Sequence, residues 1–328
     1  TSGTVRLGDG GDILTFTGGF THTAGDTALN GTLATTSDNV TIDTLVLGGA
    51  SVIDTNVGGG NITISGAITN AAPQTLTLTA GAGNIETNGT IGTTATPLGA
   101  ITITDAYDVT FGGSVDAASI TQAAGANSTT FTGNVATTGA ILITDGYDIT
   151  FSGTVNAASI TQTNGANSTT FAGDVTTTGA ITITAANDLT FSGTVAALSL
   201  AQVAGTGTTT FVENVTTSGV AGIDINATNI ALDGLTMKAT ATAANIALDG
   251  TVTLSGGAVN IEAGNSITVD GTVDGTVDGG EIFTATSTND ANIVFTSLIG
   301  GTNALGALTI DGGDITLNGI GTAVTAGV

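Results

Sequence analysis

Apolar and polar residues alternate along this chain in short runs. Ile101-Thr-Ile103, Val109-Thr-Phe111 and Gly113-Ser-Val115 show the alternation within one stretch. A period of two residues is typical of strands that bury one face, and no stretch shows the wider apolar spacing of an amphipathic helix. The pattern therefore predicts an all-β protein of many short strands.

The alternating runs recur with a fixed step between residues 99 and 218. A motif Thr-Phe-x-Gly-x-Val returns every 20 residues, and this unit is too short for a strand-helix-strand crossover. Self-similarity at such a period indicates turns stacked on one another, with equivalent residues above each other. The phenylalanines of the motif are Phe111, Phe131, Phe151, Phe171, Phe191 and Phe211.

The predicted fold is a single-stranded parallel β-helix, or β-solenoid, with about 20 residues per coil and roughly 16 coils. The six phenylalanines are expected to form a ladder inside the core. Thr110 and its equivalents alternate with them, so they point outward. Gly113 and its equivalents lie at a corner that needs an unusual backbone angle or a close approach.

A period of 40 residues overlies the period of 20, so each long repeat is a pair of unlike coils. We expect one continuous solenoid over residues 1–328. Within it, residues 1–98 form irregular coils, residues 99–218 form three 40-residue double-coil repeats, and residues 219–328 form irregular coils. Unpaired strand edges at the ends of such an array favour self-association or further coils of the same parent chain.

The charge is strongly one-sided. The chain has 26 acidic residues against Arg6 and Lys238, which gives a net charge of −24. Such a surface repels phosphate backbones, so no nucleic acid is expected as a partner. No apolar run approaches the roughly 20 residues of a spanning helix, so no transmembrane segment is predicted. An acidic chain without cysteine suits an extracellular setting.

Catalytic chemistry has few residues available. His22 is the single histidine and there is no cysteine, which argues against a transition-metal site. Polysaccharide lyases and hydrolases use clustered carboxylates, often with a basic residue, in a groove. One arginine and one lysine far apart in sequence do not fit a lyase. We expect no enzyme activity, no catalytic residue and no organic cofactor.

Calcium is the metal that this composition favours, because it takes oxygen ligands. Asp105 and Asp108 flank one predicted corner, and Asp145 and Asp148 repeat the pair 40 residues later. The hypothesis is a weak calcium site at this corner. The alternative is an acidic corner that is simply solvated.

Two surface features suggest possible binding functions for the chain. A column of outward-facing threonines suggests ice binding as one hypothesis. However, the columns beside it are irregular, and Asp108 and its equivalents interrupt them. Tyr107 and Tyr147 are also 40 residues apart. They suggest a lateral face that recognises glycans, or the surface of a host or neighbouring cell.

Three segments carry a family resemblance, namely 92–103, 108–115 and 313–317 (GTTATPLGAITI, DVTFGGSV and GDITL). They resemble the repeats of bacterial surface β-solenoid exoproteins, of the filamentous-haemagglutinin-like and autotransporter-passenger type. The resemblance implies a right-handed β-helix at the cell surface with a role in adhesion, filaments or coats. The expected function is therefore a structural extracellular rod, fibre or surface coat, as part of a larger adhesin-like protein or a self-assembling filament.

Overall fold

A computed structural model describes residues 3–56, 58–165 and 167–321. It confirms the all-β prediction: the described residues form parallel strands, stacked in turns as a β-solenoid, and no helix. Two compact units divide the chain, Thr1–Ala166 (unit 1) and Asn167–Val328 (unit 2). Together they contain about 15 turns spaced about 21 residues apart, close to the 16 coils of 20 residues expected from the sequence.

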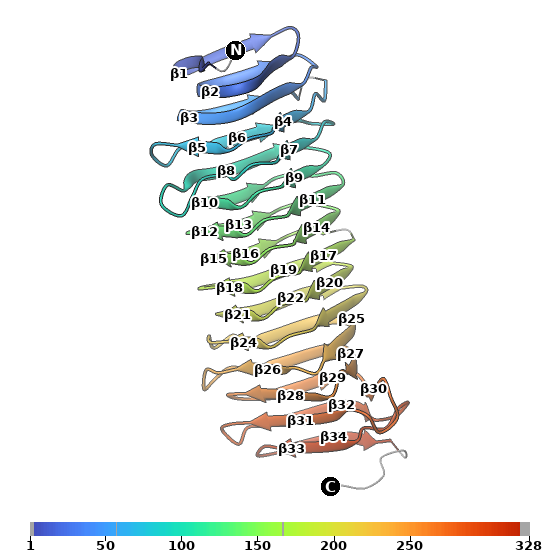
Figure 1. The fold of residues 1–328 in the computed structure, drawn as a ribbon. Coiled ribbons are helices and arrows are strands. Elements are labelled where there is room, and N and C mark those ends of the chain that lie inside the picture. Colours follow the sequence, from blue (N-terminus) through green and yellow to red (C-terminus); the bar gives the residue numbers. More distant parts are fainter. Residues whose placement is uncertain (1–2, 57, 166, 322–328) are drawn as a thin grey trace. The chain divides into compact units, whose positions relative to one another are not determined.

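Unit 1 is built from sixteen strands among its described residues (Figure 1). They are β1 (Val5–Phe16), β2 (Phe20–Thr35), β3 (Val40–Asp54), β4 (Ile62–Ile64), β5 (Ile68–Asn70), β6 (Leu76–Thr79), β7 (Ile85–Thr87), β8 (Leu98–Asp105), β9 (Val109–Phe111), β10 (Val115–Gln122), β11 (Ser128–Phe131), β12 (Val135–Thr137), β13 (Ala140–Ile143), β14 (Asp148–Phe151), β15 (Val155–Ala157) and β16 (Ser159–Gln162).

Unit 2 contains the remaining strands. They are β17 (Ser168–Phe171), β18 (Val175–Thr177), β19 (Ala180–Ala186), β20 (Asp188–Phe191), β21 (Val195–Ala197), β22 (Ser199–Gly205), β23 (Thr208–Phe211), β24 (Val215–Thr217), β25 (Ile223–Asp233), β26 (Thr236–Ala239), β27 (Ile246–Ser255), β28 (Ala258–Ala263), β29 (Ile267–Asp270), β30 (Val273–Gly275), β31 (Ile282–Ser287), β32 (Ile293–Ile299), β33 (Ala307–Asp311) and β34 (Ile315–Ile320).

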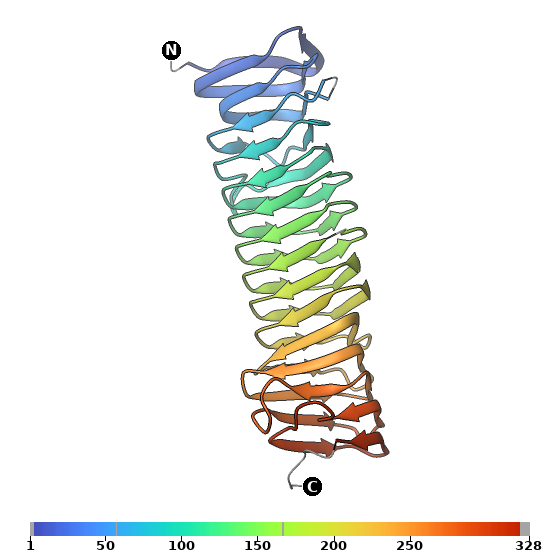
Figure 2. The ribbon, with the colours of Figure 1, turned by 90° about the vertical axis from the view of Figure 1, so that its right-hand side faces the viewer.

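Each turn contributes strand segments to three parallel sheets, which Figures 1 and 2 show from two sides. We name the sheets after one turn of the regular array: the Ile sheet contains Ile101–Ile103, the Phe sheet Val109–Phe111, and the Val sheet Val115–Ala117. Residues of one sheet pair in register from turn to turn, as Phe111 does with Phe131 and Val115 with Val135. The inward side chains of the three sheets enclose the core of each unit.

Longer turns outside the regular array explain why the chain has about 15 turns instead of the 16 predicted from the sequence. In the Phe sheet Val40 pairs with Ile62, Ile62 with Ile85, and Ile85 with Val109, so these turns take 22, 23 and 24 residues. In unit 2, Ile267 pairs with Ile293, a step of 26. Longer corner loops lengthen the turns outside the regular array without changing the stacking of their strands.

The phenylalanines of the motif lie inside the core. In unit 1 the ring centroids of Phe111 and Phe131 are 4.8 Å apart and those of Phe131 and Phe151 are 4.7 Å apart, with the rings nearly parallel. In unit 2, Phe171, Phe191 and Phe211 stack with centroids 4.9 and 5.4 Å apart. These spacings follow from the distance between strands, about 4.8 Å, and every ring is fully buried.

The corner glycine of the motif serves close approach rather than an unusual backbone angle. Gly113 has no positive φ, but a Cβ added there would overlap the backbone carbonyl of Gly89 in the preceding turn. The same residue lies against Gly133 in the next turn. Glycines stacked on glycines therefore allow the chain to pass this corner at the strand spacing.

A buried polar pair distinguishes alternate turns. Gln122 Oε1 accepts a hydrogen bond from Thr129 Oγ1 (2.9 Å), and Gln122 Nε2 donates to the carbonyl of Asp145 (3.0 Å). Both side chains are almost fully buried. Gln122 lies between Ile103 and Ile143 in the Ile sheet. The unlike coils expected from the 40-residue period therefore differ in their core, where polar and apolar turns alternate.

Unit 2 repeats the buried pair at Gln202 and Thr209, which hydrogen-bond to each other. Ile183 and Ile225 lie on either side of Gln202 in the Ile sheet. Here Gln202 Nε2 is buried without a partner among the described residues, so nothing in that part of the chain takes the place of the Asp145 carbonyl that receives this bond in unit 1.

Candidate functional surfaces

Asp108 joins two successive turns of unit 1. Its Oδ1 accepts hydrogen bonds from the backbone N–H of Ser128 (3.0 Å), from Ser128 Oγ (2.6 Å) and from Asn127 Nδ2 (2.9 Å). Burial raises the pKa of Asp108, but the bonds from Ser128 and Asn127 outweigh it and hold that pKa below its usual value. The carboxylate thus acts as a clasp between turns.

Unit 2 uses the same device. Asp188 Oδ1 accepts the backbone N–H of Thr208 (2.7 Å), again 20 residues ahead. Asp174 Oδ1 accepts both the N–H and the Oγ–H of Thr194, each at 2.8 Å. The bond from the Thr194 backbone, followed by the bond from its hydroxyl, holds the pKa of Asp174 below its usual value.

Asparagines extend the clasp into the irregular turns of unit 1. Asn39 Oδ1 accepts the N–H of Asn61 (2.8 Å), Asn61 Oδ1 that of Asn84 (2.9 Å), and Asn84 Oδ1 that of Asp108 (3.3 Å). Together with the bonds from Ser128 to Asp108, they make a continuous ladder of side chains along one corner. Each rung satisfies a backbone donor that the corner leaves outside the sheets.

This ladder bears on the predicted calcium corner. Of the four aspartates predicted to bind calcium, Asp108 accepts a hydrogen bond from Ser128 Oγ. The backbone carbonyl of Asp145 accepts one from Gln122 Nε2. The described residues hold no group of three histidine, cysteine, aspartate or glutamate side chains placed to bind a metal ion. Calcium binding at Asp105, Asp108, Asp145 and Asp148 stays a prediction.

The two tyrosines lie on the surface of unit 1 beside the aspartates. Tyr107 is 47% exposed and Tyr147 is 46% exposed. Tyr107 is held by its backbone, which donates to Gly83 and accepts from Asn127. Their exposure leaves an aromatic face on two turns, separated by the turn that carries Asn127.

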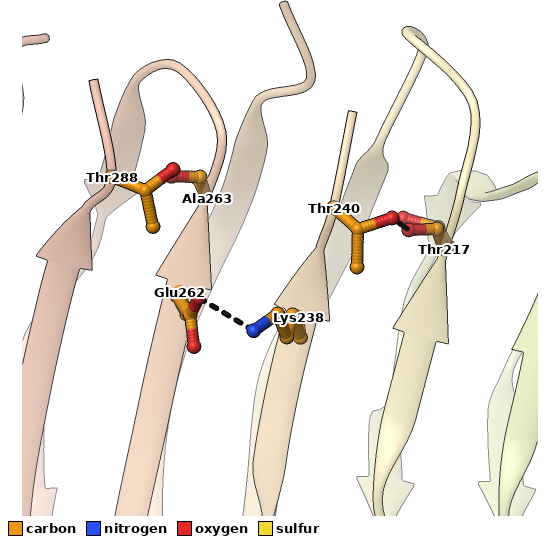
Figure 3. A network of polar contacts seen from close by, with 6 residues as sticks. All are labelled: Thr217, Lys238, Thr240, Glu262, Ala263 and Thr288. Atoms are coloured by element: carbon orange, nitrogen blue, oxygen red, sulfur yellow. Dashed lines mark hydrogen bonds and ion pairs between the residues drawn. The ribbon is translucent and has the colours of Figure 1, made fainter. Parts of the chain in front are cut away.

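The basic residues have different surroundings. Lys238 Nζ lies 2.6 Å from Glu262 Oε1 in the next turn of the Val sheet (Figure 3). Near this pair, Thr240 Oγ1 donates to the carbonyl of Thr217 (3.0 Å) and Thr288 Oγ1 to that of Ala263 (3.3 Å). Arg6 is exposed, and within the described part of the chain no carboxylate pairs with it.

His22 lies on β2, between Thr21 and Thr23. Its Nδ1 is 2.9 Å from Thr27 Oγ1. No second metal ligand joins it within the described segments.

Two hollows open on unit 1. One, of about 400 Å³, is lined by Arg6, Asp9, Asn30 and neighbouring small residues. The other, of about 300 Å³, is lined by Thr94, Asp116, Asn156 and neighbours. Each contains a single carboxylate, whereas glycoside hydrolysis in its common form uses a pair.

The described residues form no helix, and therefore none long and apolar enough to cross a membrane. Comparisons with protein-family models, with curated proteins and with solved structures gave no match to this chain. The fold alone therefore defines the class, a parallel β-solenoid repeat protein.

Sequence reasoning missed the clasps and the buried glutamines. The spacing of Asp108 to Ser128, repeated by Asp188 and Thr208, was the available signal for the clasps. Gln122, Gln162 and Gln202 recur every 40 residues in strands whose other inward residues are apolar, which was the signal for the buried pairs.

Proposed function

We propose that this protein is a structural, extracellular β-solenoid, a component of a rod, fibre or surface coat. The observation that carries the proposal is the use of its polar side chains. Asp108, Asp174 and Asp188 each bind the turn that follows, and Asn39, Asn61 and Asn84 do the same. Side chains that could bind a ligand serve instead to join turns.

The charge supports a place outside the cell. A net charge of −24 keeps lateral surfaces apart and soluble, and divalent cations of the medium screen it. With Arg6 and Lys238 as its basic residues, the chain also offers trypsin-like proteases very few cleavage sites. Both properties suit an exposed scaffold of an adhesin-like protein. The proposal gives the chain no catalytic role.

Immunogold electron microscopy of intact cells that produce the protein tests this function. Antibodies raised against the folded protein should label the cell surface or material extending from it, and trypsin treatment of intact cells should leave most of the label. Label confined to the cell interior would refute the extracellular role.

A second function, glycan recognition, is favoured by one observation, the half-exposed rings of Tyr107 and Tyr147 on unit 1. Aromatic faces stack on the apolar faces of sugars, and nearby Asp105 and Asp145 supply acceptors for hydroxyl groups. A glycan array should then give a signal that the double variant Tyr107→Ala, Tyr147→Ala loses. Retention of the signal in that variant would exclude this face.

A further inference from the structure

A loop of unit 1 projects beyond the corner that it forms. Residues 92–97 (GTTATP) join the Val sheet to the Ile sheet in the turn of Ile91. In the turns that follow, the same corner is far shorter, since β10 crosses it without a break and only residues 138–139 separate β12 from β13. The loop before β8 therefore extends beyond the next turns of the Val sheet (Figure 1).

Hydrogen bonds and backbone geometry hold this loop in one shape. Gly92 begins it with a φ of 63°, and a Cβ there would overlap the backbone of the next turn. Thr93 and Thr96 exchange backbone hydrogen bonds of 3.1 and 3.0 Å. The carbonyl of Pro97 accepts a hydrogen bond from Nδ2 of the buried Asn70 (3.0 Å). A loop ordered in advance costs a ligand little conformational entropy on binding.

The hollow of about 300 Å³, which we call the Val-sheet hollow, lies between this loop and the outward face of the Val sheet. Its floor is a column in which Asp116 pairs with Ala136 and Ala136 with Asn156, so neighbours are about 4.8 Å apart. Thr94 and Pro97 line it from the loop. The small Ala136 between two longer polar side chains makes the floor concave, and the volume lies at the low end of the range for ligand sites.

Polar atoms of the Val-sheet hollow are left over after its internal hydrogen bonds are made. Thr94 Oγ1 donates to Asp116 Oδ1 (3.2 Å). Asp116 Oδ2 and the carboxamide of Asn156 have no hydrogen-bond partner among the described residues. Thr138 Oγ1 donates to the carbonyl of Ala118 (3.4 Å) and keeps its acceptor lone pairs. Unlike the clasps, these groups are free to bind a ligand that both donates and accepts hydrogen bonds.

The lining of the hollow limits the class of ligand. One carboxylate without a basic residue repels anions, and calcium takes about six to eight oxygen ligands, usually from several carboxylates. An extended peptide needs an unpaired strand edge, but β12 in the floor pairs with β10 on one side and β15 on the other. A neutral sugar fits, because its hydroxyls can donate to Asp116 and both donate to and accept from Asn156.

We infer that the Val-sheet hollow binds the terminal neutral pyranose of a glycan. The ring lies on Ala136 with its C–H face toward Pro97, and its hydroxyls bind Asp116 and Asn156. Because the loop closes one end, the rest of the glycan leaves the hollow on the side of Asn156. This site is separate from the two tyrosines, which lie at the corner between the Ile and Phe sheets. It adds a binding function to the proposed structural role.

Saturation-transfer NMR of the 328-residue chain tests the inference. The probes are the methyl α-glycosides of glucose, galactose, mannose and N-acetylglucosamine, each titrated to about 20 mM. At least one should bind with a Kd of about 1 mM, the range for a ligand of roughly 12 heavy atoms in a shallow site. The glycoside that binds is then used to compare the variants.

Matched variants use the repeat itself as the control. Ala136→Leu fills the floor of the hollow without removing a polar group and should weaken binding about 10-fold or more. Ala196→Leu makes the same change at the equivalent outward position of unit 2, where the corner has no such loop, and should leave binding unchanged. Asn156→Ala should weaken binding about 5-fold through lost hydrogen bonds, whereas Asn164→Ala, at an exposed corner of unit 1, should not. Circular dichroism should show all four variants folded.

Three results would overturn the inference. They are a wild type that binds none of the four glycosides, equal effects of Ala136→Leu and Ala196→Leu, and loss of binding in the double variant Tyr107→Ala, Tyr147→Ala, which would move the site to the tyrosines. An Asn156→Ala variant that binds like the wild type would overturn the role of that side chain. A chain that binds no glycoside yet labels the cell surface would leave the structural role standing, so the two failures are distinguishable.

Discussion

Asp108 Oδ1 accepts both the backbone N–H (3.0 Å) and the Oγ–H (2.6 Å) of Ser128, which lies 20 residues further along the chain. Backbone ladders join the strands of successive turns, and this carboxylate joins their corner. Corners are where a solenoid turn leaves its backbone groups without sheet partners. Aspartates and asparagines at these places therefore stabilise the stacking itself.

Loss of the Asp108 clasp should lower stability. Asp108→Ala removes the hydrogen bonds that Ser128 and Asn127 donate to a carboxylate, and we expect it to lower the free energy of unfolding by about 1–2 kcal/mol, after allowance for solvent screening at a partly exposed group. Urea denaturation at pH 7 measures the change. Asp224→Ala, at an exposed lateral position, should change stability by no more than about 0.5 kcal/mol.

Acid should remove the ionic part of the same clasp. The pKa of Asp108 is lowered in the folded state, so its contribution is present above the ordinary pKa of about 3.9 and is lost as the pH falls through the folded pKa. Asp108→Asn keeps an acceptor oxygen without the charge. The wild type should exceed this variant in melting temperature at pH 7, and the difference should shrink below about pH 4. A difference independent of pH would contradict this role of the charge.

The buried Gln122–Thr129 pair should show strong coupling. Gln122→Leu leaves Thr129 Oγ1 buried without its acceptor and should cost about 1–3 kcal/mol. The double variant Gln122→Leu, Thr129→Val copies the apolar turns on either side and should be close to neutral. A double-mutant cycle by urea denaturation should then give a coupling of about 1–2 kcal/mol. Additive effects of the two single changes would refute the pairing.

Removal of one ring from the phenylalanine stack should be costly. Phe131 lies between Phe111 and Phe151 at 4.8 and 4.7 Å. Phe131→Ala leaves a cavity and should destabilise unit 1 by about 3–5 kcal/mol. Because each turn contacts only its neighbours, hydrogen exchange should accelerate most in β9, β11 and β14. Thr130→Ala, which points outward, is the control and should leave exchange nearly unchanged.

The calcium corner predicted from the sequence is tested by thermal melting with and without calcium. Binding at Asp105, Asp108, Asp145 and Asp148 should be weak, with a Kd of about 0.1–1 mM as in extracellular modules. At about ten times Kd the stabilisation should reach about 1.4 kcal/mol. The double variant Asp105→Asn, Asp145→Asn should abolish it. No shift in the wild type at about 10 mM calcium would rule the site out.

The fold could be predicted because its signal repeats. Six phenylalanines at one spacing specify turn length, and the alternation around Phe111 specifies which side is buried. In residues 1–98 and 219–328 the spacing varies from turn to turn, as between Ile267 and Ile293. Corner loops there take up extra residues without altering the strands, so turn count could be predicted only to within about one.

The clasps were harder to predict, because they connect residues whose proximity depends on register. Asp108 reads locally as an acidic corner residue, and its bond to Ser128 follows only when the two turns are superposed. Likewise Gln122 reads as an outward polar residue until its column is seen to contain Ile103 and Ile143.

The alternation of polar and apolar turns makes the length of this array a quantised property. Gln122 fits because an apolar turn with Ile143 follows it. Loss of that one turn would bring the turn of Gln162 directly onto Gln122 and remove the Asp145 carbonyl that accepts a hydrogen bond from Gln122 Nε2. Loss or gain of two turns restores the original neighbours. Viable changes in length should therefore occur in steps of 40 residues, the long period of the sequence, and a designer who extends or shortens the protein should cut in those units.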